Sequence, residues 1–415
     1  MLIILIISPF FIINAADNNR AKTDNKLQAD KPQVDKPQVD KPQVDKPQVD
    51  KPQVDKVQAQ KELLGRILFF DVNLSKNRTM SCATCHNPQT GFVDQRGNGV
   101  ESMASLGDDG HSLGDRNAPT ASYALFSPHF QKNNGKNKSK SAFIGGQFLD
   151  GREPTLAGQA GGPPLNPIEM GMPDKASVVK RLKENPGYVQ QFKKIFGEDI
   201  FADTDKAYAA MTQAIQSFEK TDFFAPFDSK YDRFLRGEYD LTVLEDLGRS
   251  LFFSNNNTNC ATCHKLRRED APRETFTNFE YRNIGVPENT ALRAKNGVTA
   301  KDLGLYQNPL AKTDDNKGKF KVSSLRNIAV TGPYMHNGVF KDLRTVVEFY
   351  DKYNNPDRQI NPETGKPWGK PEVSDNIALD ELKAKALTDR KIDALVAFMK
   401  ILTDKRYEHL LEKDQ

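Results

Sequence analysis

Four cysteines and two of the histidines stand in one repeated pattern whose spacing predicts a chemistry. The sequence Cys-Ala-Thr-Cys-His occurs at residues 82–86 and again at 260–264, and the two copies use all four cysteines of the chain. Two thiols in this spacing can add to the vinyl groups of a haem, and the histidine beside them binds the iron. One copy alone would also fit half of a zinc site, but two copies with no cysteine left over favour two c-type haems. The residues predicted to hold them are Cys82, Cys85 and His86, and Cys260, Cys263 and His264.

The start of the chain predicts export. Residues 2–13 form an apolar run, and Asn14-Ala15-Ala16 supplies small residues for cleavage, so we predict a signal peptide over residues 1–16 and a periplasmic protein. This agrees with c-type haem, which is attached outside the bacterial cytoplasm. No positive charge precedes the run, so an uncleaved membrane anchor is the alternative. The chain has 59 Lys and Arg against 55 Asp and Glu, and this balance gives no sign of a nucleic-acid partner.

Two internal repeats divide the rest of the 415 residues. Residues 31–55 are five copies of Lys-Pro-Gln-Val-Asp, and a proline at every fifth position predicts a disordered spacer over residues 17–58. The second repeat is Leu-Gly-Arg-Ile-Leu-Phe-Phe at 64–70 and Leu-Gly-Arg-Ser-Leu-Phe-Phe at 247–253, each ahead of a haem motif. It indicates an apolar helix leading into each haem loop, and hence two tandem cytochrome c-like domains.

We predict a mostly α fold with long loops and few strands, in which each domain carries one covalently bound c-type haem. The first domain spans residues 59–224 and the second 225–415, and the turn residues Ala225-Pro226-Phe227-Asp228 join them. Apolar periodicity predicts further helices over residues 176–196, 206–220, 343–350 and 390–402.

The order of several other segments resembles that of the bacterial di-haem cytochrome c peroxidases and their MauG-type relatives. The resemblance covers roughly residues 60–405. It implies that the first haem is the peroxidatic one and that the second transfers electrons. The matching segments are Arg116-Asn117-Ala118-Pro119-Thr120, Asp150-Gly151-Arg152, Pro167-Ile168-Glu169-Met170, Leu325-Arg326-Asn327 and Thr331-Gly332-Pro333-Tyr334-Met335-His336-Asn337-Gly338.

Glu169 and Gln159 are the candidate catalytic residues. Cleavage of peroxide at a ferric haem needs a base that moves a proton between the two oxygens, and it benefits from a donor to the developing charge. Glu169 lies in a proline- and glycine-rich loop, where a carboxylate can stand above a haem face without a helix crowding it. The resemblance implies that Glu169 is the catalytic acid/base and that Gln159 lines the same pocket. Without the resemblance, Glu169 would be interpreted as a solvated loop residue.

The outer iron ligands follow from the same resemblance. The peroxidases place Met fourteen residues after the His of a His-x-Gly motif; counted from His336, this position holds Tyr350, as in MauG-type proteins. A thioether favours ferrous iron, whereas a phenolate stabilises ferric and higher states. The alternatives are that Tyr350 is a packed helix aromatic or that Met335 is the ligand. His111 lies in about the right loop to cap the first iron reversibly, although a free loop histidine is the alternative.

Two further expectations concern what lies between the haems. The family commonly has Trp before Asp150-Gly151-Arg152, and in this chain Leu149 stands in its place. Because leucine cannot be oxidised, electron exchange between the haems would use direct tunnelling or another aromatic such as Phe148. The resemblance also implies one calcium ion, held by Asn117 with backbone oxygens of Thr331 and Pro333, a set of hard oxygen ligands that suits calcium.

Three functions fit these residues. The first is a peroxidase that reduces hydrogen peroxide to water with electrons from a small periplasmic cytochrome c or cupredoxin. The second is a MauG-type enzyme that uses peroxide-derived high-valent haem to oxidise side chains of a partner protein, which is the protein substrate in that case. The third is a non-catalytic electron carrier, against which Glu169 argues. The oligomeric state is left open, with a homodimer as one option.

Overall fold

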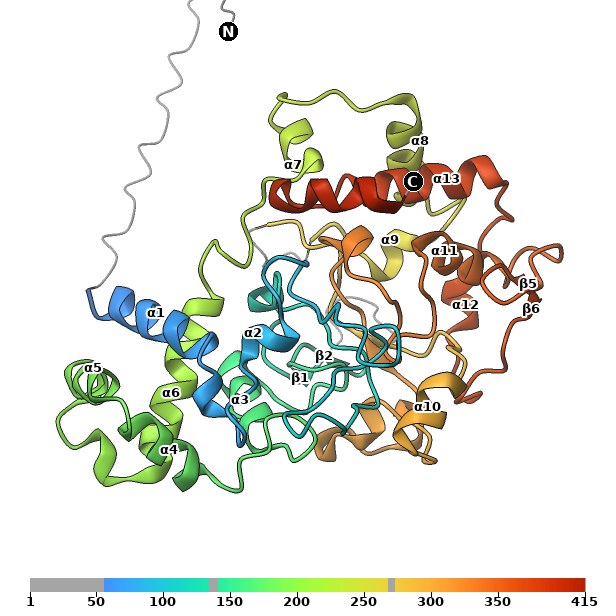
Figure 1. Cartoon of the computed structure of the whole chain (residues 1–415). Helices are drawn as coiled ribbons and strands as arrows, with labels where there is room; N and C mark the ends of the chain where they lie inside the picture. The colour runs from blue at the N-terminus through green and yellow to red at the C-terminus, as the bar shows by residue number, and fades with distance from the viewer. Residues whose placement is uncertain (1–55, 134–140, 268–272, 415) are drawn as a thin grey trace, which may run out of the picture. The chain divides into compact units, whose positions relative to one another are not determined.

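The computed structural model describes residues 56–133, 141–267 and 273–414, and this part of the chain is mostly helical with few strands, as predicted (Figure 1). The predicted signal peptide and the Lys-Pro-Gln-Val-Asp repeats lie outside the described residues. No helix in the described ranges combines the length and the apolar composition needed to cross a membrane.

Helices make up most of the regular structure. The α-helices are α1 Lys56–Phe69, α2 Cys82–Cys85, α3 Leu156–Ala160, α4 Lys175–Lys183, α5 Pro186–Phe196, α6 Thr204–Glu219, α7 Lys230–Leu235, α8 Val243–Phe252, α9 Cys260–Cys263, α10 Thr290–Asn296, α11 Leu343–Asp351, α12 Leu379–Leu382 and α13 Asp389–Lys400. Short 3₁₀ helices are η1 Val72–Leu74, η2 Ala124–Phe126, η3 Pro163–Leu165, η4 Ile200–Ala202, η5 Leu305–Gln307, η6 Pro309–Ala311, η7 Asp314–Asn316, η8 Ile328–Val330 and η9 Lys405–Asp414. The strands form three antiparallel pairs, β1 Gln131–Lys132 with β2 Phe143–Ile144, β3 Tyr281–Arg282 with β4 Phe320–Lys321, and β5 Ile360–Asn361 with β6 Lys366–Pro367.

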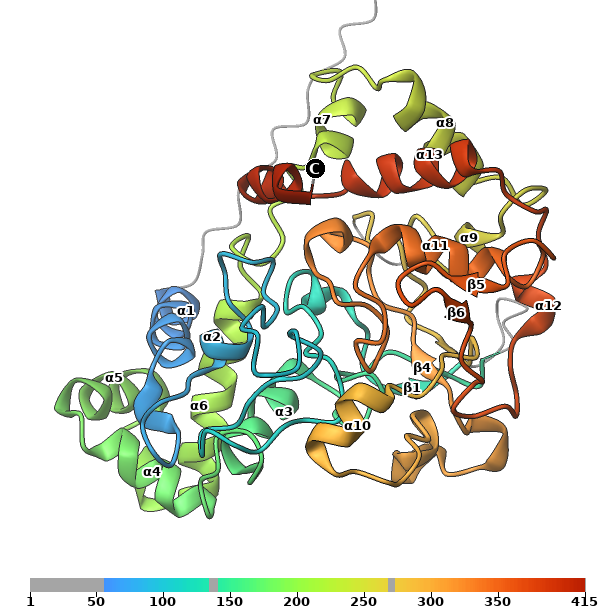
Figure 2. The ribbon, with the colours of Figure 1, turned by 45° about the vertical axis from the view of Figure 1, so that its right-hand side comes forward.

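The two copies of the Leu-Gly-Arg repeat lie in the same local structure. In residues 56–224, which we call the first half, α1 packs on α6; in residues 225–414, the second half, α8 packs on α13. Figures 1 and 2 show both helix pairs, with α13 crossing α8 at the top of each view. Gly65 faces the carbonyl of Ala214, and Gly248 faces the carbonyl of Ala394. Each glycine therefore lets two helix backbones approach more closely than a Cβ would allow.

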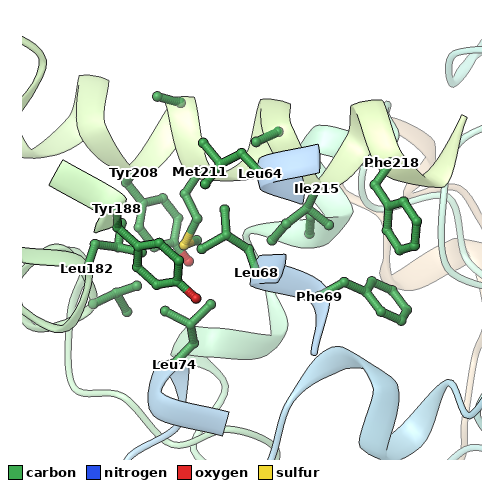
Figure 3. Packing of buried hydrophobic residues seen from close by; sticks show 14 of the residues in the cluster. Leu64, Leu68, Phe69, Leu74, Leu182, Tyr188, Tyr208, Met211, Ile215 and Phe218 are labelled. Atoms are coloured by element: carbon green, nitrogen blue, oxygen red, sulfur yellow. The ribbon is translucent and has the colours of Figure 1, made fainter. Parts of the chain in front are cut away.

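Each half has its own cluster of buried apolar side chains. Figure 3 shows the cluster of the first half, where side chains of α1 meet those of α6. Leu64, Leu68 and Phe69 are fully buried there, and Phe69 packs edge-on against Phe218 with ring centroids 5.6 Å apart. The described residues nonetheless belong to one compact unit. The division into domains at residue 225 therefore stays a prediction.

The helices follow the predicted pattern, with two differences in their bounds. The helix expected over 176–196 is two helices, α4 and α5, because Pro186 has no N–H for a continuing helix and instead begins a new one. The Asn185 side chain caps that new helix by accepting from the Gly187 N–H. The second difference is that α1 begins at Lys56, so residues 56–58, assigned to the spacer by sequence, are helical.

Several polar contacts join the two halves. Arg116 binds both carboxylate oxygens of Asp302, at 2.6 and 2.7 Å, and it also binds Asp150 at 2.7 Å. The Asn117 N–H donates to the His336 carbonyl at 2.8 Å. Since Arg116 is only 14% exposed, these charge-assisted bonds are protected from solvent and fix the position of the loop that precedes the predicted calcium ligand.

Glu219, at the end of α6, supplies a prediction about stability. The residue is buried, its Oε2 has no hydrogen-bond partner, and burial raises its pKa to about 8 from an ordinary 4.5. The folded state therefore keeps a proton that the unfolded chain releases above about pH 4.5, so the stability that this proton gives is lost as pH rises toward 8. We expect Glu219→Gln to be neutral near pH 4 and to raise the free energy of unfolding on the order of 2 kcal/mol at pH 7. Denaturant unfolding at both pH values checks this, and a difference that did not change with pH would contradict it.

Candidate haem sites

The first haem motif is one helical turn followed by a histidine with a fixed ring. Ser81 and Thr84 form a capping box at the start of α2, which sets the turn that carries Cys82 and Cys85. The Nδ1 of His86 lies 3.2 Å from the carbonyl oxygen of Phe92. A proton on Nδ1 makes this hydrogen bond and leaves the Nε2 lone pair free to bind a metal.

The second motif repeats this arrangement. The Nδ1 of His264 lies 3.1 Å from the carbonyl oxygen of Phe276, and both phenylalanines are fully buried with a left-handed backbone, at φ 59° and 53°. Burial lowers the pKa of both imidazoles, to about 4 at His264, so each ring is neutral at physiological pH, which is the form that can bind iron. Sequence reasoning missed both carbonyl partners. Phe92 lies six residues after His86, but Phe276 lies twelve after His264, so no shared spacing points to them.

A cavity of about 390 Å³ lies beside the second motif, and its wall is largely apolar. Cys260, Cys263 and His264 line it, and so does Tyr350 of α11. Thiols, an imidazole and a phenol on the wall of one apolar cavity fit a covalently attached porphyrin with its iron. The donor set and the cavity therefore suit the second c-type haem.

Tyr350 is held where a second axial ligand is predicted. Burial raises its pKa, and the nearby thiols of Cys263 and Cys260 raise it further. Met335 lines the same cavity. The structure thus brings both candidate ligands to the second motif, and the choice of Tyr350 over Met335 stays a prediction.

Glu169 lies in a loop tied to the segment that leads into the first haem motif. Its carbonyl accepts from the Asp108 N–H at 2.7 Å, and the next carbonyl, of Met170, accepts from the Lys76 N–H at 2.9 Å.

The Asn166 amide donates to Glu169 Oε1 at 2.9 Å. Burial raises the pKa of Glu169, while Arg152 and Asn166 lower it, and its charge acts in turn on the Cys85 thiol. Glu169 is therefore a half-buried carboxyl near the first motif rather than a solvated one.

Gln159 and Arg152 flank this loop. Gln159 lies in α3, and its carbonyl accepts from the Gly162 N–H at 3.0 Å, where the glycine- and proline-rich segment begins. The Arg152 guanidinium stacks over the Phe148 ring at 3.6 Å and binds Asp150 at 2.9 Å. Sequence reasoning gave Arg152 no role. In the structure, the positive charge of Arg152 acts on Glu169 and lowers its pKa.

His111 lies apart from these groups. Its side chain is 80% exposed, and Nε2 lies 3.2 Å from Asp109 Oδ2. Nδ1 contacts the Asp109 carbonyl at 3.0 Å, so the ring is held by its own loop. Its role as a reversible ligand of the first iron stays a prediction, because ligation would require this exposed loop to move inward.

The three residues predicted to bind calcium line one cavity. Asn117, from the first half, lines the cavity wall together with Thr331 and Pro333 from the second half. The Asn117 amide nitrogen donates to the carbonyls of Ser102 and Met103, at 3.2 and 3.4 Å, which leaves its Oδ1 as the ligand atom. A hard cation could be held by oxygens in this way. Calcium binding itself stays a prediction.

Comparison with known proteins places the chain in a family. The family of di-haem cytochrome c peroxidases matches residues 59–240. The chain is also 50% identical over 359 residues to the methylamine utilization protein MauG of Paracoccus denitrificans, covering 85% of this chain and 90% of that protein. The chain therefore belongs to the di-haem cytochrome c peroxidase family, and this membership implies two c-type haems.

Two other relatives support the same conclusion. The cytochrome c551 peroxidase of Pseudomonas aeruginosa is 29% identical over 289 residues, which cover 69% of this chain and 70% of that protein. The crystal structure of the di-haem peroxidase BthA from Burkholderia thailandensis superposes with a TM-score of 0.74 at 30% identity, covering 84% of this chain and 86% of that one. The expectation of a di-haem peroxidase fold is thus confirmed.

Proposed function

We propose that this protein is a di-haem peroxidase that reduces hydrogen peroxide to water with electrons from a small cytochrome c or cupredoxin. The observation that carries the proposal is the half-buried Glu169 beside the first haem motif, with a raised pKa and one oxygen held by Asn166. We infer that the first and second halves each bind one haem, through the Cys-Ala-Thr-Cys-His motifs. We further propose that the signal peptide of residues 1–16 exports the protein to the periplasm.

Each residue of the first site has a defined task in this proposal. Haem iron, when bound, supplies the redox chemistry that breaks the peroxide O–O bond. Because Glu169 Oε1 accepts from Asn166, Oε2 is the atom that takes the proton from the inner peroxide oxygen and delivers it to the outer one. Gln159 donates a hydrogen bond to the charge that develops there. Arg152 keeps part of the Glu169 population ionised and ready to act as a base.

The second site has a different task. His264 and Tyr350 would hold the second iron, and a phenolate there would stabilise its oxidised states. Asn117 with the backbone oxygens of Thr331 and Pro333 would bind a calcium ion, and such an ion would hold one half against the other. Arg116 supports this arrangement because it binds Asp302 and Asp150 and so holds the segment that leads into Asn117.

A second candidate function is favoured by two observations taken together. The chain is 50% identical to a methylamine utilization protein, MauG, and Tyr350 stands on the wall of the second haem cavity where the peroxidases place Met. The oxidising equivalents of peroxide would then pass to side chains of a partner protein, and those side chains would replace a reduced cytochrome as the electron source. The first proposal and this one share the peroxide chemistry and differ in the electron source.

Peroxide consumption by the purified holoprotein tests the proposal. We expect two haems per chain by mass, and we expect oxidation of two equivalents of a reduced small cytochrome c for each peroxide consumed. A single porphyrin per chain would contradict it. Peroxide consumption without cytochrome oxidation, accompanied by oxidised side chains in an added partner protein, would favour the second candidate.

The identity of the second ligand gives a separate prediction. We expect Tyr350→Met to raise the reduction potential of the second haem on the order of 0.1 V, within the span of about 0.8 V that axial ligands cover. It should also add a thioether–iron charge-transfer band in the red, which the parent protein lacks. Tyr353→Phe is the matched control, because the Tyr353 hydroxyl donates to the Ile284 carbonyl. Such a band already present in the parent protein would overturn the assignment of Tyr350.

A further inference from the structure

A buried tyrosine hydroxyl contacts a buried carboxylate where the two halves meet. The Tyr123 hydroxyl donates to Asp404 Oδ1 at 2.5 Å, and both residues are shielded from solvent, at 1% and 0% exposure. The other carboxylate oxygen accepts from the Asn327 amide at 2.8 Å, and the Asp404 N–H donates back to Asn327 Oδ1 at 2.8 Å. The carboxylate is therefore held in one position with one oxygen aimed at the phenol.

The surroundings leave Asp404 able to gain a proton. Burial, together with the charge of Asp228, raises its pKa to about 6, whereas Arg326 and the two hydrogen-bond donors lower it. Asp404 is therefore mostly ionised at neutral pH and is a stronger base than an exposed aspartate. A phenol becomes strongly acidic when it loses an electron, so an acceptor at 2.5 Å is what its oxidation needs.

Short contacts connect Tyr123 to the histidine of the first motif. The carbonyl of Phe92 accepts from His86 Nδ1 at 3.2 Å and also from the Ala121 N–H at 3.3 Å. Ala121 is two residues before Tyr123 in the chain. Two hydrogen bonds at one carbonyl, followed by the backbone from Ala121 to Tyr123, thus link the imidazole to the phenol.

Two pairs of aromatic rings, bridged by Arg326, lead toward the second motif. The Tyr123 ring meets Phe227 edge-on at 4.9 Å, and Tyr231 meets Phe276 at 5.2 Å. The Arg326 guanidinium lies over all four rings, at 4.9 to 5.9 Å from their centroids. The carbonyl of Phe276 accepts from His264 Nδ1, so the cluster ends at the second predicted iron ligand. Tyr123 also lines the cavity of that haem.

We propose that Tyr123 is a redox-active relay between the two haem sites and that Asp404 is the acceptor of its phenolic proton. The proposal rests on the proposed function for its oxidant, hydrogen peroxide. One electron passes from the phenol to a haem site that peroxide has oxidised, the O–H bond breaks, and the proton moves to Asp404 Oδ1. Tyr123 becomes a neutral phenoxyl radical and Asp404 a neutral acid. Peroxide takes up two electrons and two protons in forming two waters, and Tyr123 supplies one of those electrons.

The return step balances in the same way. One electron from the reduced donor, or from an oxidisable partner protein, restores the phenolate, and Asp404 returns the proton. Because the proton moves to Asp404, the oxidised Tyr123 ring stays neutral. A cationic ring would be repelled by the buried Arg326 guanidinium that faces it.

Electron paramagnetic resonance after rapid mixing with peroxide tests the relay. We expect the holoprotein to give a tyrosyl radical signal, and we expect Tyr123→Phe and Asp404→Asn each to reduce its yield at least tenfold. Replacement of Tyr123 by 3-fluorotyrosine keeps the hydroxyl, and it should add a fluorine splitting to the signal. This variant assigns the radical even if the other two fold poorly.

Tyr188→Phe is the matched control. Tyr188 is also buried, and its hydroxyl donates to a carboxylate, Asp71 Oδ2 at 2.8 Å, but it belongs to the buried apolar cluster of the first half (Figure 3). We expect this variant to keep the full radical yield. A signal that is lost in Tyr188→Phe, or that lacks a fluorine splitting in the labelled protein, would overturn the proposal.

The haem absorption spectrum separates this proposal from the proposed function. If peroxide changes the haem spectrum but no radical with fluorine splitting forms, the relay is wrong and the peroxidase function stands. If peroxide leaves the haem spectrum unchanged, the function is wrong, and a photogenerated one-electron oxidant then tests the relay directly. With that oxidant, radical formation at Tyr123 supports the proposal and its absence overturns it.

Discussion

Replacement of Glu169 by glutamine is expected to lower peroxide turnover by about 10²–10³-fold, while the haem content and the haem spectra of the oxidised protein stay unchanged. Glutamine has nearly the shape of glutamate and keeps an oxygen for the Asn166 amide, but it cannot take a proton at neutral pH. The measurement is the initial rate of oxidation of a reduced small cytochrome c at saturating peroxide. A rate within about threefold of the parent would show that Glu169 does not move the proton.

Two further variants sharpen this result. Glu184→Gln is the control, because Glu184 is 43% exposed and is paired with Arg78, and we expect no change in rate. Asn166→Ala frees Glu169 Oε1 and should cost about tenfold through lost positioning. The pH profile is also informative: burial raises the pKa of Glu169, so kcat/KM should fall with decreasing pH at a higher pH than for an ordinary carboxyl. Glu169→Gln should remove this limb.

Alanine at Gly65 or Gly248 is expected to destabilise the fold by about 3 kcal/mol at each site, even though alanine favours helix by about 1 kcal/mol. A Cβ at either position would overlap a backbone carbonyl, of Ala214 or Ala394, and would lie 3.0 or 2.8 Å from the Cβ of Phe218 or Phe398. Neither backbone can move without separating the helix pair. The free energy of unfolding in guanidinium measures the loss.

Gly97→Ala is the matched control for both glycines. A Cβ at Gly97 would meet no heavy atom within 4 Å, so we expect a change within about 0.5 kcal/mol. The double variant Gly65→Ala with Gly248→Ala should lose close to the sum of the single effects if the two helix pairs are independent. Equal stability of Gly65→Ala and Gly97→Ala would show that α1 and α6 can separate without cost.

The helices were predictable because their signals are local. The apolar pattern ahead of each haem motif gives α1 and α8, and the periodicity of 206–220 and 343–350 gives α6 and α11. The break at Pro186 could also have been predicted, since proline lacks the N–H that a continuous helix needs. The prediction of one long helix followed the apolar periodicity, which continues on both sides of the proline. The function of the two glycines was not predictable, because the carbonyls that they face lie about 150 residues further along the chain.

For the candidate site, too, local features were predictable from the sequence and long-range contacts were not. The sequence by itself determined the covalent chemistry, because two thiols and an imidazole within five consecutive residues need no distant partner to define a haem attachment motif. Only the tertiary structure decided which groups surround those motifs: the burial that raises the pKa of Glu169, the cavity that brings Tyr350 to Cys263, and the contact of Tyr123 with Asp404. Burial and proximity depend on how segments hundreds of residues apart pack together, and no local pattern of residue types carries that information.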